Sequence, residues 1–477
     1  MDVLLVNTNR MKPPIAPLAF DYLGGTLKTA GHRARLLDFG LAEDPAQAAR
    51  RAFAGSRPDV VALTFRNSDD CYFASGASFV DVLRNDVELL RQHHDGPLLV
   101  GGGGFSVLPE LLLDHAGADY GVVGDGETAL LEFLRFRRGD IAAEAVPGLV
   151  HRRRGVWRRN PVRPADLAAP GLSARDTVDN AAYFRRGGQA GVETKRGCPG
   201  RCVYCADPPI KGRSVRRRRP DDVVSEVRNL LAQGIDHLHF CDSEFNLPAD
   251  HAEDVCRALI DGGVAPKIRW FAYAAPQPFT PDFAALLRRA GCAGVNFGAD
   301  SASDPMLKRL GRDHSADRLA ETARLCRKNK ITFMYDLLIG GPGETPDTAR
   351  ETLRAVQKME VDRVGVAVGV RVYPGTPLAE QIKREPALRA GLRGDPESLA
   401  PAFYVSPALG ADPFDLVRTL TGNDDRFLLP SGKDEKDYNY NDNTVLARAV
   451  EAGHRGAYWD ILRRLKQGLP PGAVGRD

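Results

Sequence analysis

Three cysteines within eight residues restrict the possible structures of this chain more than any other feature. Cys198, Cys202 and Cys205 follow a short strand-like run with C-x3-C-x2-C spacing. Soft thiolates this close in sequence can converge on one metal centre. No Cys or His within about ten residues supplies a fourth ligand, although structural zinc usually has four protein ligands. The spacing therefore favours a four-iron cluster with one iron open to a substrate or cofactor over a three-cysteine zinc loop.

Strands and helices alternate on both sides of this motif, which predicts an α/β fold. Residues 1–140 are expected to form a Rossmann-like, doubly wound parallel sheet. Residues 191–375 are expected to form a partial (β/α)6 barrel. A linker with a hairpin at 147–158 is expected over 141–190, and a mainly helical cap over 376–477. The expected strands are 3–6, 34–39, 60–65, 97–100 and 120–123 in the first sheet, and 191–194, 237–241, 268–272, 294–297, 333–339 and 363–371 in the barrel.

The overall composition narrows the classes of function. A length of 477 residues suffices for two or three domains, and a net charge of +3 indicates no polyelectrolyte partner such as a nucleic acid. Apolar runs of about 18 residues and a signal peptide are not recognisable, so no membrane association is expected. Eight cysteines in so long a chain do not indicate a disulfide framework. We therefore expect a cytoplasmic location, which an oxygen-sensitive cluster would require.

The cysteine motif, with Tyr204 before its third cysteine, resembles the signature of the radical S-adenosylmethionine (SAM) superfamily. The resemblance implies a [4Fe-4S] cluster held by the three cysteines, with SAM chelating the fourth iron. In that family an electron, here from an external donor such as flavodoxin or ferredoxin, cleaves SAM to a 5′-deoxyadenosyl radical.

Three later strand ends resemble the SAM-binding segments of the same superfamily. Asp242-Ser243-Glu244 stands where the family has Gly-Gly-Glu, so only Glu244 is carried over, as the acceptor for the amino group of SAM. Asp300 and Ser301 follow the fourth strand and are implied to bond the ribose and carboxylate. Gly340 and Gly341 follow the fifth strand, in the segment that lies against the adenine.

A Rossmann-like domain before such a core resembles the cobalamin-binding domain of the B12-dependent radical SAM enzymes. Four glycines after the fourth strand let the backbone approach a bulky ligand closely. The alternative is a structural domain without a ligand. By the resemblance, the cobalamin-binding residues are Thr64, Gly101, Gly102, Gly103 and Gly104, with Gly124 and Glu127 in a Gly-x-Gly-Glu turn that ends the domain.

One departure from the family pattern concerns the lower face of cobalt. The Asp-x-His-x-x-Gly motif that supplies a histidine is missing, because residues 7–16 contain none. Arg66 ends the third strand instead, and an arginine cannot deprotonate to ligate a metal. In this respect the chain is similar to the tryptophan 2-C-methyltransferase type. Alternatively, Arg66 forms an ion pair with Asp69 or Asp70.

Several further residues have weaker assignments. Arg213 and Arg216 to Arg219 form a basic run that we interpret as surface or as a lid over SAM. Tyr438 and Tyr440 offer rings and hydroxyls to a substrate, or belong to a structural cap. Cys256, Cys292 and Cys326 are expected in the core. Cys71 and Cys241 fall next to predicted site loops, and burial is the favoured interpretation for both, with a role in the site as the alternative.

Together these patterns predict a cobalamin-dependent radical SAM C-methyltransferase that acts on a small metabolite or natural-product precursor. Arg66 and Tyr438 are its predicted catalytic residues. The methyl group would be transferred after hydrogen abstraction from an sp3 carbon or by direct attack of an aromatic carbon, and Arg66 favours the second. The alternatives are a cyclisation or rearrangement, a radical SAM enzyme with an empty B12-like domain, and a tRNA-modifying or cobalamin-sensing protein.

Overall fold

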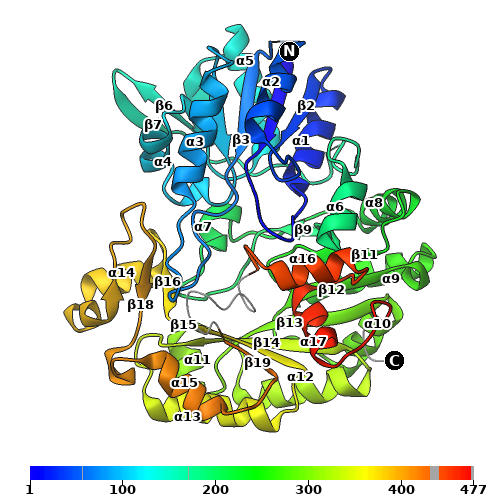
Figure 1. The fold of residues 1–477 in the computed structure, drawn as a ribbon, viewed down its shortest axis with the longest axis vertical. Helices are drawn as coiled ribbons and strands as arrows, with labels where there is room; N and C mark the ends of the chain where they lie inside the picture. Colours follow the sequence, from blue (N-terminus) through cyan, green and yellow to red (C-terminus); the bar gives the residue numbers. More distant parts are fainter. Residues whose placement is uncertain (56, 170, 430–439, 474–477) are drawn as a thin grey trace.

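Each half of the chain is built on a seven-stranded sheet in the computed structural model, which describes residues 1–55, 57–169, 171–429 and 440–473 (Figure 1). In the first sheet, five parallel strands have the order β2-β1-β3-β4-β5, and an antiparallel hairpin, β6–β7, extends the edge. The strands are β1 (Asp2–Asn7), β2 (Arg33–Asp38), β3 (Val60–Thr64), β4 (Leu98–Gly101), β5 (Tyr120–Val122), β6 (Leu149–Arg153) and β7 (Val156–Arg159).

Helices cover both faces of this sheet, so the doubly wound prediction is confirmed. Apolar side chains of α1 (Leu18–Thr29) and α5 (Gly126–Arg138) share one core with the sheet. Those of α2 (Pro45–Ala54), α3 (Val80–Arg91) and α4 (Pro109–Ala116) form a second core on the opposite face. The predicted hairpin is present, but it belongs to this sheet, so only the part of the expected linker after residue 159 connects the two halves, through α6 (Asn180–Gly187).

The second sheet is an open, wholly parallel barrel with the order β19-β15-β14-β13-β12-β11-β8. All six predicted barrel strands are present, and β19, from the C-terminal tail, is added at the edge. The strands are β8 (Ala190–Val192), β11 (His237–Phe240), β12 (Arg269–Ala274), β13 (Cys292–Asp300), β14 (Thr332–Ile339), β15 (Arg363–Val368) and β19 (Phe427–Leu428), and the helices packed outside them are α8 (Pro220–Ala232), α9 (Ala249–Asp261), α10 (Pro281–Arg289), α12 (Ala316–Lys328), α13 (Pro346–Lys358) and α15 (Pro413–Thr421).

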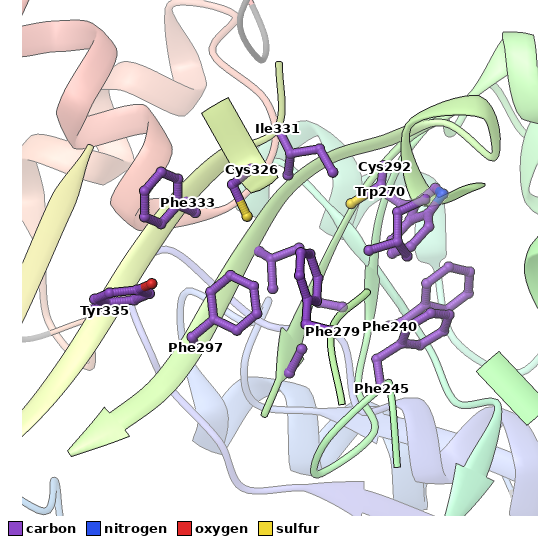
Figure 2. Close-up of a cluster of buried hydrophobic side chains, with 14 of the residues drawn as sticks. Phe240, Phe245, Trp270, Phe279, Cys292, Phe297, Cys326, Ile331, Phe333 and Tyr335 are labelled. Carbon is purple, nitrogen blue, oxygen red and sulfur yellow. The ribbon is translucent and has the colours of Figure 1, made fainter. Parts of the chain in front are cut away.

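The outer face of the barrel sheet carries the largest hydrophobic core. Figure 2 shows Phe240, Phe245 and Trp270 packed together, and the rings of Phe240 and Trp270 lie 4.8 Å apart. The indole N–H of Trp270 donates to the carbonyl of Ala290, so its polar atom is satisfied. Because alternate strand residues point to opposite faces, the residues between these core positions face the inside of the barrel.

The C-terminal helices α16 (Thr444–Glu451) and α17 (Tyr458–Lys466) fill part of that inner face. They pack on Phe271 and Met334, and Trp459 meets the ring of Phe271 edge to face at 6.0 Å. A short turn separates the two helices. Gly456 has a φ of +103°, and a Cβ there would lie 2.6 Å from the Phe271 ring, so only glycine fits.

The rest of the tail is less helical than expected. The predicted strand 363–371 divides at Gly369, whose φ is +85°. After this turn, β16 (Val370–Val372) leaves the barrel and joins β18 (Ala402–Tyr404) and β17 (Leu392–Arg393) in a small antiparallel sheet covered by α14 (Pro377–Arg384). No helix within the described ranges is long and apolar enough to cross a bilayer.

Candidate functional site

The cysteine loop begins and ends at a two-stranded antiparallel sheet, β9 (Lys195–Arg196) and β10 (Arg216–Arg217). The buried carboxylate of Asp242, just after β11, fixes its start. It accepts hydrogen bonds from the amide of Thr194 at 2.8 Å and from Nζ of Lys195 at 2.7 Å. The family motif assigns no role to Asp242, although this residue lies in the same segment as Glu244.

Two of the three cysteine side chains lie beside Gly200. A Cβ at this glycine would lie 3.2 Å from Sγ of Cys198 and 3.9 Å from Sγ of Cys202. Burial raises the pKa of all three thiols, that of Cys205 to about 12, and a bound metal deprotonates such a thiol outright. No three His, Cys, Asp or Glu side chains in the described ranges are placed around a single ion. A cluster takes each thiolate on a different iron, so three cysteines on one short loop fit it.

Arg312, between α11 (Asp304–Arg309) and α12, joins the cysteine loop to the next polar group. It donates to Sγ of Cys202 at 2.8 Å and lies 3.4 Å from Asp300 and 3.8 Å from Glu244. Tyr204 donates to the same Asp300 carboxylate at 2.5 Å. The structure thus brings together Tyr204, Glu244 and Asp300, as the motifs predicted, around an arginine that no motif marked.

Glu244 has the chemistry needed for an ammonium ligand. Its Oε2 is buried and has no hydrogen-bond partner within the described part of the chain. Burial raises the pKa of this carboxyl to about 7, although the nearby Arg312 opposes the shift. A buried acceptor without a donor is costly, and a cationic amine would satisfy it.

Ser301, Gly340 and Gly341 lie at neighbouring strand ends, but each has different surroundings. The Ser301 hydroxyl is 2.7 Å from that of Thr352 on α13, so its bond is made within the protein. Gly340 has a φ of +103°, and a Cβ at Gly341 would touch Leu310 at 3.2 Å. Close packing of the chain therefore accounts for these two glycines.

The four glycines at the end of β4, Gly101 to Gly104, divide into two kinds. A Cβ at Gly102 would lie 2.6 Å from the carbonyl of Phe65, and one at Gly104 would lie 2.7 Å from Asn67, so packing against the loop after β3 requires them. Gly101 and Gly103 have no neighbour closer than 3.4 Å. Together with Thr64 at the end of β3, they lie at the carboxyl edge of the sheet, and close packing does not account for Gly101 and Gly103.

Arg66 follows β3 on a loop that reaches the barrel (Figure 1). Its guanidinium donates to Sδ of Met11 at 3.0 Å. The ion pairs within the described part of the chain include none from Arg66 to Asp69 or Asp70, and Asp69 pairs with Arg371 at 2.9 Å instead. Arg66 is therefore exposed at the sheet edge where the glycines lie.

Comparison with known proteins agrees with this arrangement. The B12 binding domain model matches residues 5–134, and the Radical SAM superfamily model matches residues 192–356. The tryptophan 2-C-methyltransferase of Streptomyces laurentii is 30% identical over 96% of this chain and 95% of that protein. This chain belongs to the same family. It is an enzyme, a cobalamin-dependent radical SAM methyltransferase.

Solved structures show the same architecture. The radical SAM methyltransferase TsrM of Kitasatospora setae, solved with tryptophan and a SAM analogue, has a TM-score of 0.89 at 30% identity and covers 98% of both chains. Its structure with cobalamin and a [4Fe-4S] cluster has a TM-score of 0.88 at 29% identity. The cobalamin-dependent SAM radical enzyme OxsB has a TM-score of 0.72 at 18% identity and covers 85% of this chain, so it shares the fold.

In this methyltransferase, the residues at the base of the cysteine loop contact the first domain. Arg196 lies 2.9 Å from Asp125, 3.0 Å from Glu127 and 2.8 Å from Glu193, and Arg216 also pairs with Asp125. Burial alone would raise the pKa of Asp125, but Arg196 and Arg216 hold it below its usual value. Glu127, predicted to contact cobalamin, is therefore engaged in an ion pair between the domains.

A second buried network joins the same two domains. Arg218 pairs with Glu226 of α8 and donates to the hydroxyl of Tyr22 on α1 at 3.2 Å. Asp21 of α1 is 3.2 Å from Arg175. The interpretation of the basic run as surface or lid is thus wrong for Arg216 and Arg218, which lie in buried domain contacts. It is confirmed for Arg217 and Arg219, which are exposed.

The remaining candidate residues have varied surroundings. Cys256, Cys292 and Cys326 are buried, as predicted. Cys71 and Cys241 are exposed, so the favoured interpretation of burial is wrong for these two. Tyr440 packs against Tyr458 of α17, with ring centroids 5.8 Å apart. Tyr438 lies outside the described residues.

Replacing Arg196 by Met should lower the free energy of unfolding by about 3–5 kcal/mol, because three buried carboxylates lose their shared cation. Anaerobic urea unfolding followed by fluorescence measures this change. The matched control is Arg219→Met in the same basic run, where the side chain is 71% exposed and should leave the transition unchanged. Equal unfolding curves for the two variants would contradict a role for the buried network.

Proposed function

We propose that this enzyme methylates a carbon atom of a small aromatic metabolite, and that tryptophan or a related indole is the first candidate. The observation that supports this most is 30% identity to a tryptophan 2-C-methyltransferase over 95% of its length. The likeness to TsrM with bound tryptophan supports the same substrate class. Overall, the methyl C–S bond of SAM breaks with its electron pair left on sulfur. A C–C bond forms at a nucleophilic carbon, which releases a proton.

The cofactor assignments are part of this proposal. Cys198, Cys202 and Cys205 would hold the [4Fe-4S] cluster, Glu244 the amino group of SAM, and Thr64 with Gly101 and Gly103 the cobalamin. When bound, these groups supply SAM activation and a methyl carrier. Because Ser301 and Glu127 have partners within the protein, we now assign them to holding the strand ends in place rather than to direct cofactor contact.

The chain's own residues would divide the remaining tasks. The buried carboxylates Glu244 and Asp300 would orient SAM, with Arg312 between them compensating their charge. Arg66 offers donors but no lone pair, so it would not provide a lower ligand to cobalt. That property favours transfer of the methyl group as a cation equivalent to an aromatic carbon.

The same proposal includes a cytoplasmic location and an external one-electron donor such as flavodoxin or ferredoxin. It also includes the domain boundaries near residues 140, 190 and 375, which the two sheets and the family-model matches support.

Cys202→Ala should abolish cluster assembly, because it removes one of three thiolate ligands on the loop. After anaerobic reconstitution, iron and sulfide analysis should show loss of the cluster, and S-adenosylhomocysteine release should stop. Cys326→Ala, in the barrel core, is the control and should retain both. A full cluster in Cys202→Ala would show that the loop is not the ligand set.

The affinity for SAM should fall as the pH drops below about 7. Glu244 accepts an ammonium group only when ionised, and burial raises its pKa to about 7, so the acceptor is lost as the pH falls through that value. Equilibrium dialysis between about pH 6 and 8 should show up to tenfold weaker binding per pH unit below the pKa. Glu244→Gln should bind weakly at every pH, whereas Glu253→Gln on the exposed side of α9 should behave as wild type. A flat profile for the wild type would refute this role.

Arg66→Lys should alter the absorption bands of bound cobalamin, because a lysine can lose its proton and approach cobalt as a ligand. The rate of product formation should fall with it. Arg84→Lys on α3 of the same domain serves as the control and should change neither. If Arg66→Lys gave an unchanged spectrum and full activity, Arg66 would have no place beneath the cobalt.

A further inference from the structure

The inner face of the barrel sheet carries polar side chains that the proposed cofactor sites do not use. Ala272, Phe297 and Tyr335 belong to the helix-covered core, so the strand residues next to them face inward. On β12 and β14, one inward-facing residue packs against the C-terminal helices, Phe271 on β12 and Met334 on β14. The next inward residues along β12 and β14, Tyr273 and Asp336, lie beyond that contact, towards the strand ends.

Asp336 lies beside the proposed SAM site. It pairs in register with Gly298 on the neighbouring strand, about 4.8 Å away. The carbonyl of Gly298 accepts a hydrogen bond from Arg312, and a Cβ on this glycine would lie 3.7 Å from Oε1 of Glu244. The Asp336 carboxylate is therefore one strand away from the group proposed to hold SAM.

Asn296 fixes the orientation of this carboxylate. Its Nδ2 donates to Oδ2 of Asp336 at 2.8 Å, and the residue is 5% exposed. Asn296 is in turn the register partner of Tyr273 on β12. Asp336, Asn296 and Tyr273 thus form a continuous polar row across three strands.

Aromatic side chains from three parts of the chain surround the row. Tyr273 lies between the core residues Ala272 and Ala274, so it faces the inside of the barrel, and it is 44% exposed there. The ring of His239 meets it edge to face at 5.0 Å. Tyr72, on the loop after β3, and Tyr440, before α16, pack beside the C-terminal helices, and the charge of Asp336 contributes to the raised pKa of both.

We propose that Asp336 binds the cationic amino group of an aromatic amine substrate, with Tyr72, Tyr273 and Tyr440 around it. This inference rests on the proposed function and adds the group by which the substrate is recognised. A carboxylate held by an amide, with aromatic side chains nearby, attracts an ammonium ion by charge, and the rings add cation–π contact. The same carboxylate repels anionic substrates, and it binds a substrate with an uncharged ring more weakly than one with an ammonium group.

The experiment uses the holoenzyme, reconstituted anaerobically with iron, sulfide and cobalamin. Methylation is measured for tryptophan, tryptamine, tyrosine and tyramine and for the matching arylpropanoic acids, which lack the amino group. The wild type should methylate at least one amine with a kcat/KM about 10–100-fold above that of its deaminated analogue, the factor contributed by one charge-assisted hydrogen bond. Asp336→Asn should remove most of this preference, and Asp336→Glu should keep it at a lower rate.

Asp347→Asn, the same change at a side chain that is 90% exposed on α13, is the control and should match the wild type. Iron content and corrinoid absorbance report whether each variant is folded. If Asp336→Asn does not take up the cofactors, the preference for amines is tested with Asp336→Glu instead. The inference is overturned if the wild type shows no preference for amines, or if Asp336→Asn slows amines and deaminated analogues equally, as contact with a ring N–H would. If the wild type releases no S-adenosylhomocysteine without an acceptor, the proposed function itself has failed.

Discussion

Buried ion pairs on both sides of β9, the strand at which the cysteine loop begins, determine the geometry of the site. On the barrel side, Asp242 holds Lys195, and on the other side Arg196 holds Asp125 and Glu127 of the first domain. Such pairs contribute little net stability, since removing charges from water costs about as much as their attraction returns. Their value is directional, because a buried charge that loses its partners is strongly destabilising, so β9 is held in one position relative to both domains.

That constraint explains why the two domains function as one unit. A cluster on the loop and a ligand at the edge of β3 and β4 belong to different sheets, and nothing in either sheet alone fixes their relative position. The arginines of β9 and β10, together with the contact between Asp69 and Arg371, connect the first domain to the cysteine loop and to the small antiparallel sheet. A polar interface of this kind resists sliding, whereas an apolar one tolerates repacking.

The sequence was sufficient to predict what depends on local pattern. Apolar strands, the cysteine spacing, and the Glu244 and Asp300 strand ends are short-range signals, and the structure places them as expected. Contacts between distant segments were not predictable. Arg312 lies 110 residues from the cysteine to which it donates. The basic run looked solvated because four consecutive arginines carry no sign of the carboxylates that Asp125 and Glu226 supply from other segments. Ser301 and Glu127 matched family motifs, but Ser301 bonds to Thr352 and Glu127 pairs with Arg196. A motif cannot show such contacts with distant residues.

The origin of the substrate-facing side chains suggests how such an enzyme changes specificity while keeping its cofactors. The proposed cofactor sites lie on strand ends where close packing permits only glycine, as at Gly102 and Gly104, so substitutions there disturb the fold. The aromatic residues around Asp336 come from the loop after β3, from β12 and from the segment before α16, and none of them is required by backbone geometry. Exchanging them would alter the wall of the substrate site without moving the cysteine loop. Selection for a new acceptor molecule should therefore act first on the loop after β3 and on the C-terminal helices, and last on the ion pairs that position β9.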